Sequence, residues 1–207
     1  GREHALVFID FRTLSAETVP LPPDVAFLLA DTGVKHNLAA SAYNDRRAQC
    51  EQAAAYFAAR LDHPVRALRD VSPAEWRAHA AGLDPAAARR AAHVIGENTR
   101  VLDAVRRLRE GDAASLGALM SQSHESSRTQ FENSCPELDF VAAEAARLPG
   151  VLGARLSGGG FGGSAVLLLR PEAAPDAGRV LAAAYERAFR RPLALRRVRA
   201  SAGARVL

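Results

Sequence analysis

Five glycines lie within six consecutive positions, between two apolar runs of strand length; they are Gly158, Gly159, Gly160, Gly162 and Gly163. Glycine loses more conformational freedom on ordering than any other residue. A cluster of glycines therefore indicates a backbone that needs positive φ or that approaches another group closely. Backbone amides in such a loop can line a pocket for an anion. Ser157 to Gly163, with Phe161 in the middle of the glycines, is thus the first candidate site.

Two common phosphate-binding motifs do not fit this loop. Gly158, Gly160 and Gly163 match G-x-G-x-x-G, but a dinucleotide fingerprint needs a helix after the loop. Here Ala165-Val-Leu-Leu-Leu169 follows, which predicts a buried strand. No Gly-Lys-Ser/Thr closes the loop, so it is not a Walker loop. The expected geometry is strand, glycine loop, strand, and a hairpin whose glycines only permit tight packing remains the alternative.

Four other polar residues could take part in chemistry, and each has a structural interpretation as well. His124 could be a general base, but a single histidine within a helix more often has a structural role. Arg46 and Arg47 could bind phosphate, because the guanidinium fork suits phosphate oxygens, or could form ion pairs with a neighbouring helix. Asp31 ends a predicted strand and is expected to cap the turn Asp31-Thr-Gly33.

Composition restricts the class of protein. The net charge is +4, and Lys35 is the only lysine among 27 basic residues, which alternate with acids in alanine-rich segments. This pattern indicates solvated helix faces and no nucleic-acid partner. The two cysteines and six histidines have no metal-ligand spacing, so we expect no metal site in this chain and free cytosolic thiols. No apolar run approaches the roughly 20 residues that span a bilayer, which predicts a cytoplasmic protein with no membrane contact.

The periodicity of apolar residues predicts the elements that must position the loop. We expect strands over residues 4–10, 25–31, 165–169 and 193–199, with the strand at 165–169 in a glycine hairpin that follows Pro149-Gly150. We expect helices over residues 41–61, 73–80, 85–110, 113–130, 135–148 and 174–190. A loop closed by Pro20, Pro22 and Pro23 should separate the first two strands, and Ser134-x-x-Glu137 predicts a capping box for the helix at 135. Helices segregated from a mainly antiparallel sheet make an α+β protein.

The glycine loop resembles a known family motif. Leu156-Ser-Gly-Gly-Gly-Phe-Gly-Gly-Ser164 is similar to the third, C-terminal motif of the GHMP small-molecule kinases, in the form found in galactokinases. Segments 34–50, 93–100, 119–124 and 134–139 resemble further galactokinase motifs, in the same order and spacing. The resemblance covers about residues 4 to 170. It implies that residues 1–207 form the C-terminal lobe of the GHMP kinase fold, which is ferredoxin-like, with residues 1–20 a strand and linker to a missing N-terminal half.

The resemblance also implies a function. Such a protein would transfer phosphate from ATP, with Mg²⁺, to the anomeric hydroxyl of D-galactose. Tyr43 matches the family tyrosine whose hydroxyl contacts the sugar, although it could instead begin the apolar stripe of its helix. The family's phosphate loop and catalytic Asp precede a strand like Ala5–Asp10, so we expect no catalytic residue here, most of the ATP and Mg²⁺ contacts in the missing half, and an inactive isolated chain. A non-catalytic sugar sensor and a GHMP kinase of another specificity are the alternatives.

Overall fold

A four-stranded antiparallel sheet forms the centre of the fold in the computed structural model of the chain. The structure describes the backbone of residues 1–35 and 39–204, and the side chains of residues 1–35 and 42–204. The strands are β3 (Ala26–Asp31), β4 (Val151–Leu156), β5 (Ser164–Leu169) and β6 (Ala194–Val198). Their order is β4-β5-β3-β6. The central strands β5 and β3 are continuous apolar runs, as expected of strands covered on both faces.

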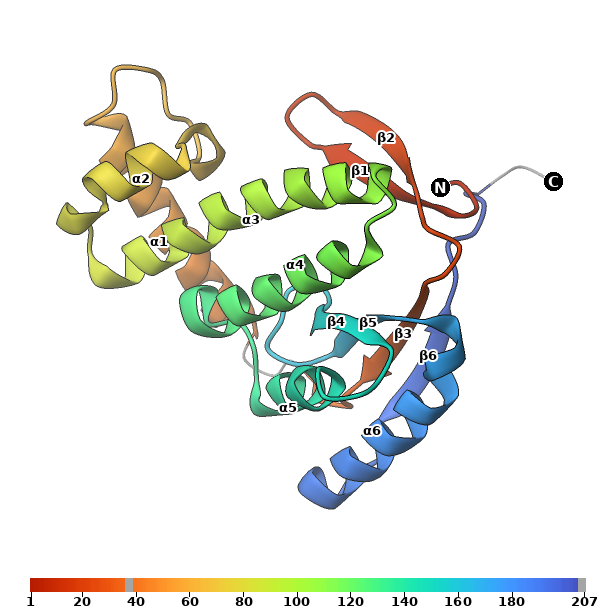
Figure 1. Ribbon diagram of the computed structural model, residues 1–207. Coiled ribbons are helices and arrows are strands. Elements are labelled where there is room, and N and C mark those ends of the chain that lie inside the picture. The colour runs from red at the N-terminus through yellow and green to blue at the C-terminus, as the bar shows by residue number, and fades with distance from the viewer. Residues whose placement is uncertain (36–38, 205–207) are drawn as a thin grey trace.

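Helices cover both faces of this sheet. On one face, α5 (Pro136–Ala145) and α6 (Ala174–Phe189) pack Leu138 and Leu181 against inward side chains such as Leu167. On the other face, α4 (Ala113–Ser126) packs Leu116 near Leu168. Figure 1 shows the sheet between α4 above and the α5–α6 pair below. The close fit of α4 on β4 depends on small residues, since a Cβ at Gly117 would lie 2.3 Å from the Leu152 carbonyl oxygen.

Three further helices form a separate cluster at the end of the molecule remote from α6 (Figure 1). They are α1 (Ala39–Ala58), α2 (Pro73–His79) and the long α3 (Pro85–Arg109), with the 3₁₀ turns η1 (Leu68–Asp70) and η2 (Ala80–Gly82) between them. Phe57 is fully buried in this cluster. Helix α3 extends from here to the β1–β2 end of the molecule (Figure 1), where Leu108 belongs to the same core cluster as Leu116 of α4 and Leu168 of β5.

The chain begins with a hairpin of β1 (Ala5–Asp10) and β2 (Ser15–Pro20). Our expectation of a loop between Asp10 and Pro20 missed β2. The three prolines that indicated a loop lie at the end of β2 and beyond it, where a missing N–H costs no ladder bond. The hairpin is held to the helices by Arg69, which donates to both Asp10 carboxylate oxygens at 2.9 and 3.1 Å. These bonds hold the pKa of Asp10 at about 2.

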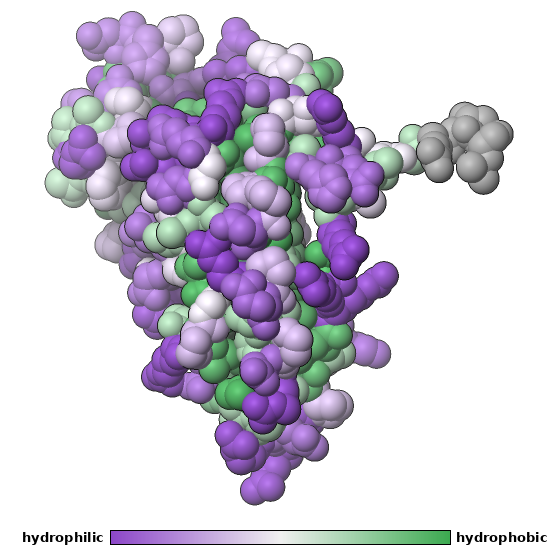
Figure 2. All heavy atoms as spheres, turned by 45° about the vertical axis from the view of Figure 1, so that its right-hand side comes forward, coloured by the Kyte–Doolittle hydropathy of each residue, from purple (hydrophilic) through white to green (hydrophobic). Residues whose placement is uncertain are grey.

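The α+β prediction and the order of the other elements are confirmed. The short 3₁₀ turn η4 (Pro171–Ala173) leads into α6. The face that includes α6 and β6 is largely hydrophilic, with hydrophobic side chains confined to a narrow band (Figure 2). Within the described ranges no helix is long and apolar enough to cross a membrane.

Candidate active-site loop

The glycine loop connects the neighbouring antiparallel strands β4 and β5, so the strand, loop, strand prediction is confirmed. At its base the Ser157 N–H donates to the Ser164 carbonyl at 2.8 Å. Gly160 and Gly162 are buried, whereas Gly158 and Gly159 are exposed. The loop therefore has a part that packs against its own chain and a part that faces outward.

The buried part requires glycine for two reasons. Gly160 has φ +82° and Gly162 has φ +134°, which are conformations that L side chains rarely adopt. A Cβ on Gly160 would lie 2.0 Å from the Asn133 carbonyl oxygen, and one on Gly162 would lie 2.8 Å from the Val34 carbonyl oxygen. At Gly158 and Gly159, by contrast, an added Cβ would meet nothing within 4 Å.

Asn133 holds the packed part of the loop from one side. Its carbonyl accepts the Phe161 N–H at 2.5 Å, and its Nδ2 donates to the Gly159 carbonyl at 3.0 Å. Asn133 is only 6% exposed. Sequence reasoning missed this residue because it lies in no predicted element. It follows η3 (Ser127–Phe131), a π-helical turn that replaces the last turn of the predicted helix at 113–130.

Thr32 and Val34 hold the loop from the other side. The Thr32 N–H and Oγ1 both donate to the Gly163 carbonyl, at 3.0 and 2.6 Å, and the Gly163 N–H donates to the Val34 carbonyl at 3.1 Å. The turn that follows β3 is capped as predicted, because Asp31 Oδ1 accepts the Gly33 N–H at 2.9 Å. These bonds join the loop to the segment that leads toward α1.

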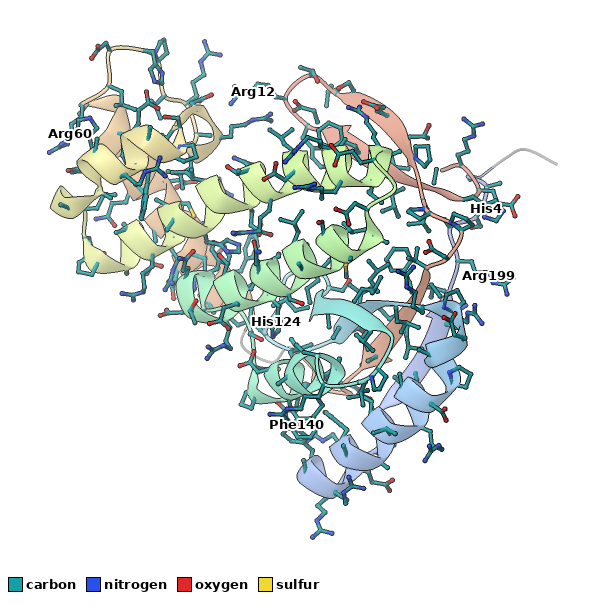
Figure 3. All side chains as sticks on the ribbon, viewed as in Figure 1. His4, Arg12, Arg60, His124, Phe140 and Arg199 are labelled. Atoms are coloured by element: carbon teal, nitrogen blue, oxygen red, sulfur yellow. The ribbon has the colours of Figure 1, made fainter. Side chains whose placement is uncertain are left out.

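His124 supports the entry to the loop and is largely buried. It lies between α4 and the sheet (Figure 3) and is 6% exposed. Its Nδ1 accepts the Leu156 N–H at 3.2 Å, which places the proton on Nε2, 3.2 Å from Asp139 Oδ1. Burial lowers its pKa in spite of that carboxylate. These contacts support the structural interpretation of His124.

Ser134 supports the same contact. Its Oγ donates to Asp139 Oδ1 at 2.6 Å, while the N-cap of α5 is Cys135 and carries no side-chain cap bond. The capping box predicted for Ser134 and Glu137 is therefore wrong. The hydroxyl bonds a carboxylate within the helix and leaves the N-cap position to its neighbour.

Both arginines of α1 bond to groups of this chain. Arg46 donates to the Phe131 carbonyl at 2.7 Å and to the Glu132 carbonyl at 2.9 Å. Its guanidinium carbon lies 6.0 Å from the centre of the Phe161 ring. Arg47 pairs with Glu51 on the same helix at 2.8 Å. Arg47 thus forms an ion pair, but within its own helix and not with a neighbouring helix as predicted, and Arg46 stabilises the turn beside the loop.

A polar cluster on α3 bonds to the end of α4, next to the same turn. His93 Nδ1 is 2.9 Å from Ser126 Oγ, and burial lowers the pKa of His93 to about 4. Burial would raise the pKa of Glu97, but hydrogen bonds from Ser123 and Arg100 outweigh it and lower the pKa. His93 and Glu97, in the segment 93–100 that resembles a family motif, thus bond to serines of α4, and Arg100 pairs with Glu97 on its own helix.

Tyr43 lies near the start of α1 and is 58% exposed. It is not a buried member of the apolar stripe, although Phe57 further along α1 is fully buried. Arg46 is three residues on and so lies on the same side of the helix. Tyr43 therefore shares the side of α1 that reaches the glycine loop. Residue His36, which belongs to the same sequence motif, lies outside the described residues.

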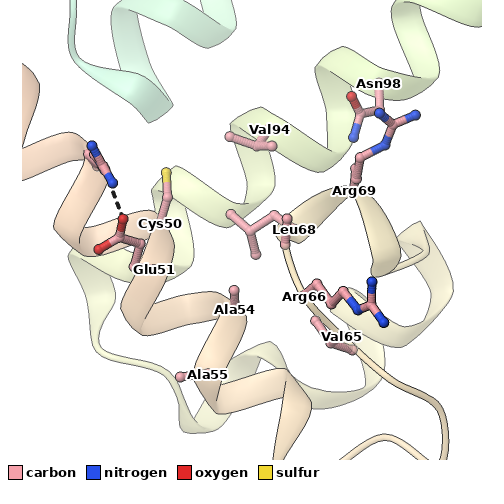
Figure 4. Close-up of a pocket in the computed structure, with 12 residues that line it drawn as sticks. Cys50, Glu51, Ala54, Ala55, Val65, Arg66, Leu68, Arg69, Val94 and Asn98 are labelled. Atoms are coloured by element: carbon pink, nitrogen blue, oxygen red, sulfur yellow. Dashed lines mark hydrogen bonds and ion pairs between the residues drawn. The ribbon is translucent and has the colours of Figure 1, made fainter. Parts of the chain in front are cut away.

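A groove of about 560 Å³ lies elsewhere, between α1, η1 and α3 (Figure 4). Its floor is apolar and includes Leu68 and Val94, and Cys50 lies at one side. Arg47 and Arg69 at its edge are already paired with Glu51 and Asp10. Neither Tyr43 nor the glycine loop lines this groove, so the candidate site remains at the loop.

Comparison with known proteins identifies this arrangement. Residues 102–187, from α3 through the glycine loop into α6, match the family described as GHMP kinases C terminal. The chain thus contains the C-terminal domain of a GHMP kinase. Within that class it is homologous to galactokinases. It is 41% identical over 191 residues to the galactokinase of Mannheimia succiniciproducens and 42% identical over 204 residues to that of Roseiflexus sp.. These alignments cover 90% and 98% of this chain.

Solved structures agree with the fold. The galactokinase of Lactococcus lactis, complexed with galactose, matches with a TM-score of 0.92 and 29% identity over 98% of this chain. The mevalonate kinase of L. major matches with a TM-score of 0.53 and 22% identity over 96% of this chain, which indicates the fold alone. The chain covers 48% and 52% of the two curated relatives, 52% of the galactokinase structure and 50% of the mevalonate kinase structure. The expected fold, a GHMP kinase C-terminal lobe, is confirmed, and the chain spans about half the length of the proteins it matches.

Proposed function

We propose that this chain is the C-terminal half of a galactokinase, which transfers the γ-phosphoryl group of ATP to the anomeric hydroxyl of D-galactose. The observation that carries the proposal is the match, with a TM-score of 0.92, to a galactokinase complexed with galactose. Identity of 41% to a second galactokinase over 90% of the chain supports it. Free thiols at Cys50 and Cys135 suit a cytoplasmic location.

In this proposal the chain supplies one wall of the sugar site. The Tyr43 hydroxyl bonds the sugar, and its exposed ring leaves that hydroxyl available. Residues Ser157 to Gly163 pack behind the phosphates, with Gly158 and Gly159 as the outward part of the loop. In-line phosphoryl transfer relies on positioning and charge stabilisation more than on acid–base chemistry. A half that forms one wall of the sugar site and contains no general base is therefore compatible with such an enzyme.

The nucleotide site, the metal site and the catalytic carboxylate belong to the other half. ATP and Mg²⁺ bind mainly there, where Mg²⁺ neutralises the phosphate charge. Among the described side chains of this chain, no group of three or more His, Cys, Asp or Glu is placed to hold a metal ion. The catalytic carboxylate is likewise assigned to the other half, and the isolated chain is inactive.

The hairpin offers a surface for that other half. Leu6 and Phe8 pack inward, whereas Val7 and Ile9 on the opposite face are 42% and 48% exposed. Phe11 and Leu14, beyond the strand, are 79% and 83% exposed. Single exposed apolar residues are common, but four large ones on one small hairpin form a group that suits an apolar partner surface. We assign this face to the N-terminal half.

A substrate panel tests the specificity. The full-length protein is assayed for ADP release with Mg-ATP and galactose, N-acetylgalactosamine or mevalonate. We expect galactose to give the highest kcat/KM. Preference for another acceptor would refute the galactose assignment and retain the GHMP kinase class. Galactose binding without turnover would support the alternative of a sugar sensor.

A further inference from the structure

Asn133 is placed to control the shape of the glycine loop. Its carbonyl and its side-chain amide bond two different loop residues, Phe161 and Gly159, on either side of Gly160. The Gly160 backbone then lies against Asn133 so closely that no side chain fits between them. One buried residue therefore fixes three consecutive positions of the loop.

The position of Asn133 is itself fixed by a charged cage around Glu132. Glu132 has a left-handed backbone, with φ 55° and ψ 46°, which is uncommon for a residue other than Gly, Asn or Asp. Its carboxylate is 2.6 Å from Arg90 Nη2 and 3.3 Å from Arg89 Nε, and Arg46 bonds its carbonyl at 2.9 Å. Arg90 is only 2% exposed. These three arginines stabilise the turn that directs Asn133 at the loop.

We propose that Asn133 is a positioning residue of the phosphotransferase site, which holds the glycine loop in its binding-competent shape before substrate arrives. The inference rests on the proposed function for its effect on substrate, although the clamp itself does not depend on activity. If the loop were loose, substrate would bind only the competent fraction, and the apparent dissociation constant would rise by the inverse of that fraction. The proposed function places the loop behind the phosphates, and Gly163 also bonds Val34 in the segment that precedes Tyr43, so the KM for galactose should rise together with that for ATP.

The side-chain part of the clamp can be removed without a large change of shape. Leucine has nearly the outline of asparagine and lacks the amide donor. Asn133 Oδ1 is buried with no partner among the described residues, so leucine also removes an unpaired acceptor. Replacing such a group by an apolar one of the same shape is close to neutral for global stability. The Gly159 carbonyl that loses its donor belongs to an exposed residue, which water can reach.

The test combines hydrogen exchange and kinetics in the full-length protein. In Asn133→Leu we expect amides of residues 157–164 to exchange at least about tenfold faster, with exchange elsewhere and the melting temperature little changed. The KM for galactose should rise about tenfold together with that for ATP, with kcat changed less than threefold. A purely structural defect would lower the active fraction and leave KM unchanged. Asn98→Leu, at an exposed asparagine of α3, is the matched control and should alter neither readout.

Several outcomes would overturn the proposal. Unchanged loop exchange or an unchanged galactose KM in folded Asn133→Leu would do so. If that variant does not fold, the wild-type protein still decides, because a Phe161 amide exchanging at the rate of an unstructured peptide would exclude the clamp. Absence of galactose phosphorylation in the wild-type protein would refute the proposed function separately, and the loop exchange would still be informative.

Discussion

Replacement of Gly160 by alanine tests the structural interpretation of the loop most sharply. The residue has φ +82°, so a Cβ costs about 1–2 kcal/mol through backbone strain. The same Cβ would lie 2.0 Å from the Asn133 carbonyl oxygen, a backbone atom that cannot rotate away. Overpacking of this kind costs about a further 1–3 kcal/mol. Gly160→Ala should therefore lose about 2–5 kcal/mol of unfolding free energy.

Gly158 and Gly159 in the same loop serve as controls that separate backbone strain from overpacking. Gly158 has φ +80° but open space around its Cβ, so Gly158→Ala should lose only the strain of about 1–2 kcal/mol. Gly159 has neither feature, and Gly159→Ala should be neutral or stabilising by up to about 1 kcal/mol. For a chain of this size each kcal/mol corresponds to about 2–4 °C in Tm. Gly160→Ala should therefore melt roughly 4–20 °C lower than the wild type.

The unfolding free energy and Tm of the three variants are measured by denaturant titration and calorimetry, and kcat/KM is measured in the full-length protein. The expected order of stability loss is Gly160, then Gly158, then Gly159. Equal losses for Gly160→Ala and Gly158→Ala would refute the contact with Asn133. Unchanged activity and unchanged Tm in Gly160→Ala would indicate that the loop is a hairpin without a functional constraint. A loss of activity without a loss of stability at Gly158 or Gly159 would locate the contact with the other half.

Three further predictions concern other sites. In the full-length protein Tyr43→Phe should weaken galactose use by about 0.5–1.5 kcal/mol, measured as kcat/KM, with the ATP KM unchanged; a rise in the ATP KM alone would place Tyr43 at the nucleotide. Gly117→Ala should lower the unfolding free energy by about 1–3 kcal/mol because its Cβ would strike β4, although alanine favours a helix; a stabilised variant would contradict the α4–β4 packing. Because the folded pKa of His93 is about 4, below its ordinary 6.5, the unfolded state binds the extra proton between these values. His93 should thus lower stability as the pH falls from 6.5 to 4, and His93→Gln should flatten a urea-monitored stability profile there.

The order of the elements could be predicted because it depends on local signals. The apolar runs at 25–31 and 165–169 and the periodic helices were clear in the sequence, and the glycines marked the hairpin between β4 and β5. Strand β2 was missed because it is exposed apart from Val19 and lacks the apolar pattern of a buried strand. Local chemistry also misplaced the α5 cap, since Ser134 bonds Asp139 and not the helix end.

The candidate site could be predicted only in part. The loop was named from its cluster of glycines and from motif resemblance, and Tyr43 from the resemblance alone; their roles remain predictions. Asn133, Thr32 and Arg90 could not be identified, because their contacts depend on the antiparallel register of β3 with β5 and on the π turn after α4. Nothing in the spacing of residues 32, 90 and 133 indicates that they approach one loop or the turn beside it. Such contacts arise from tertiary packing, which sequence periodicity does not encode.

The central claim is that this chain forms one wall of a galactose kinase and depends on another half for catalysis. The direct measurement is ADP release, with galactose and Mg-ATP, by the 207-residue chain alone and by the full-length protein. We expect no turnover above background from the chain alone and about 1–100 per second from the full-length protein. Turnover by the isolated chain, or none by the full-length protein, would contradict the account.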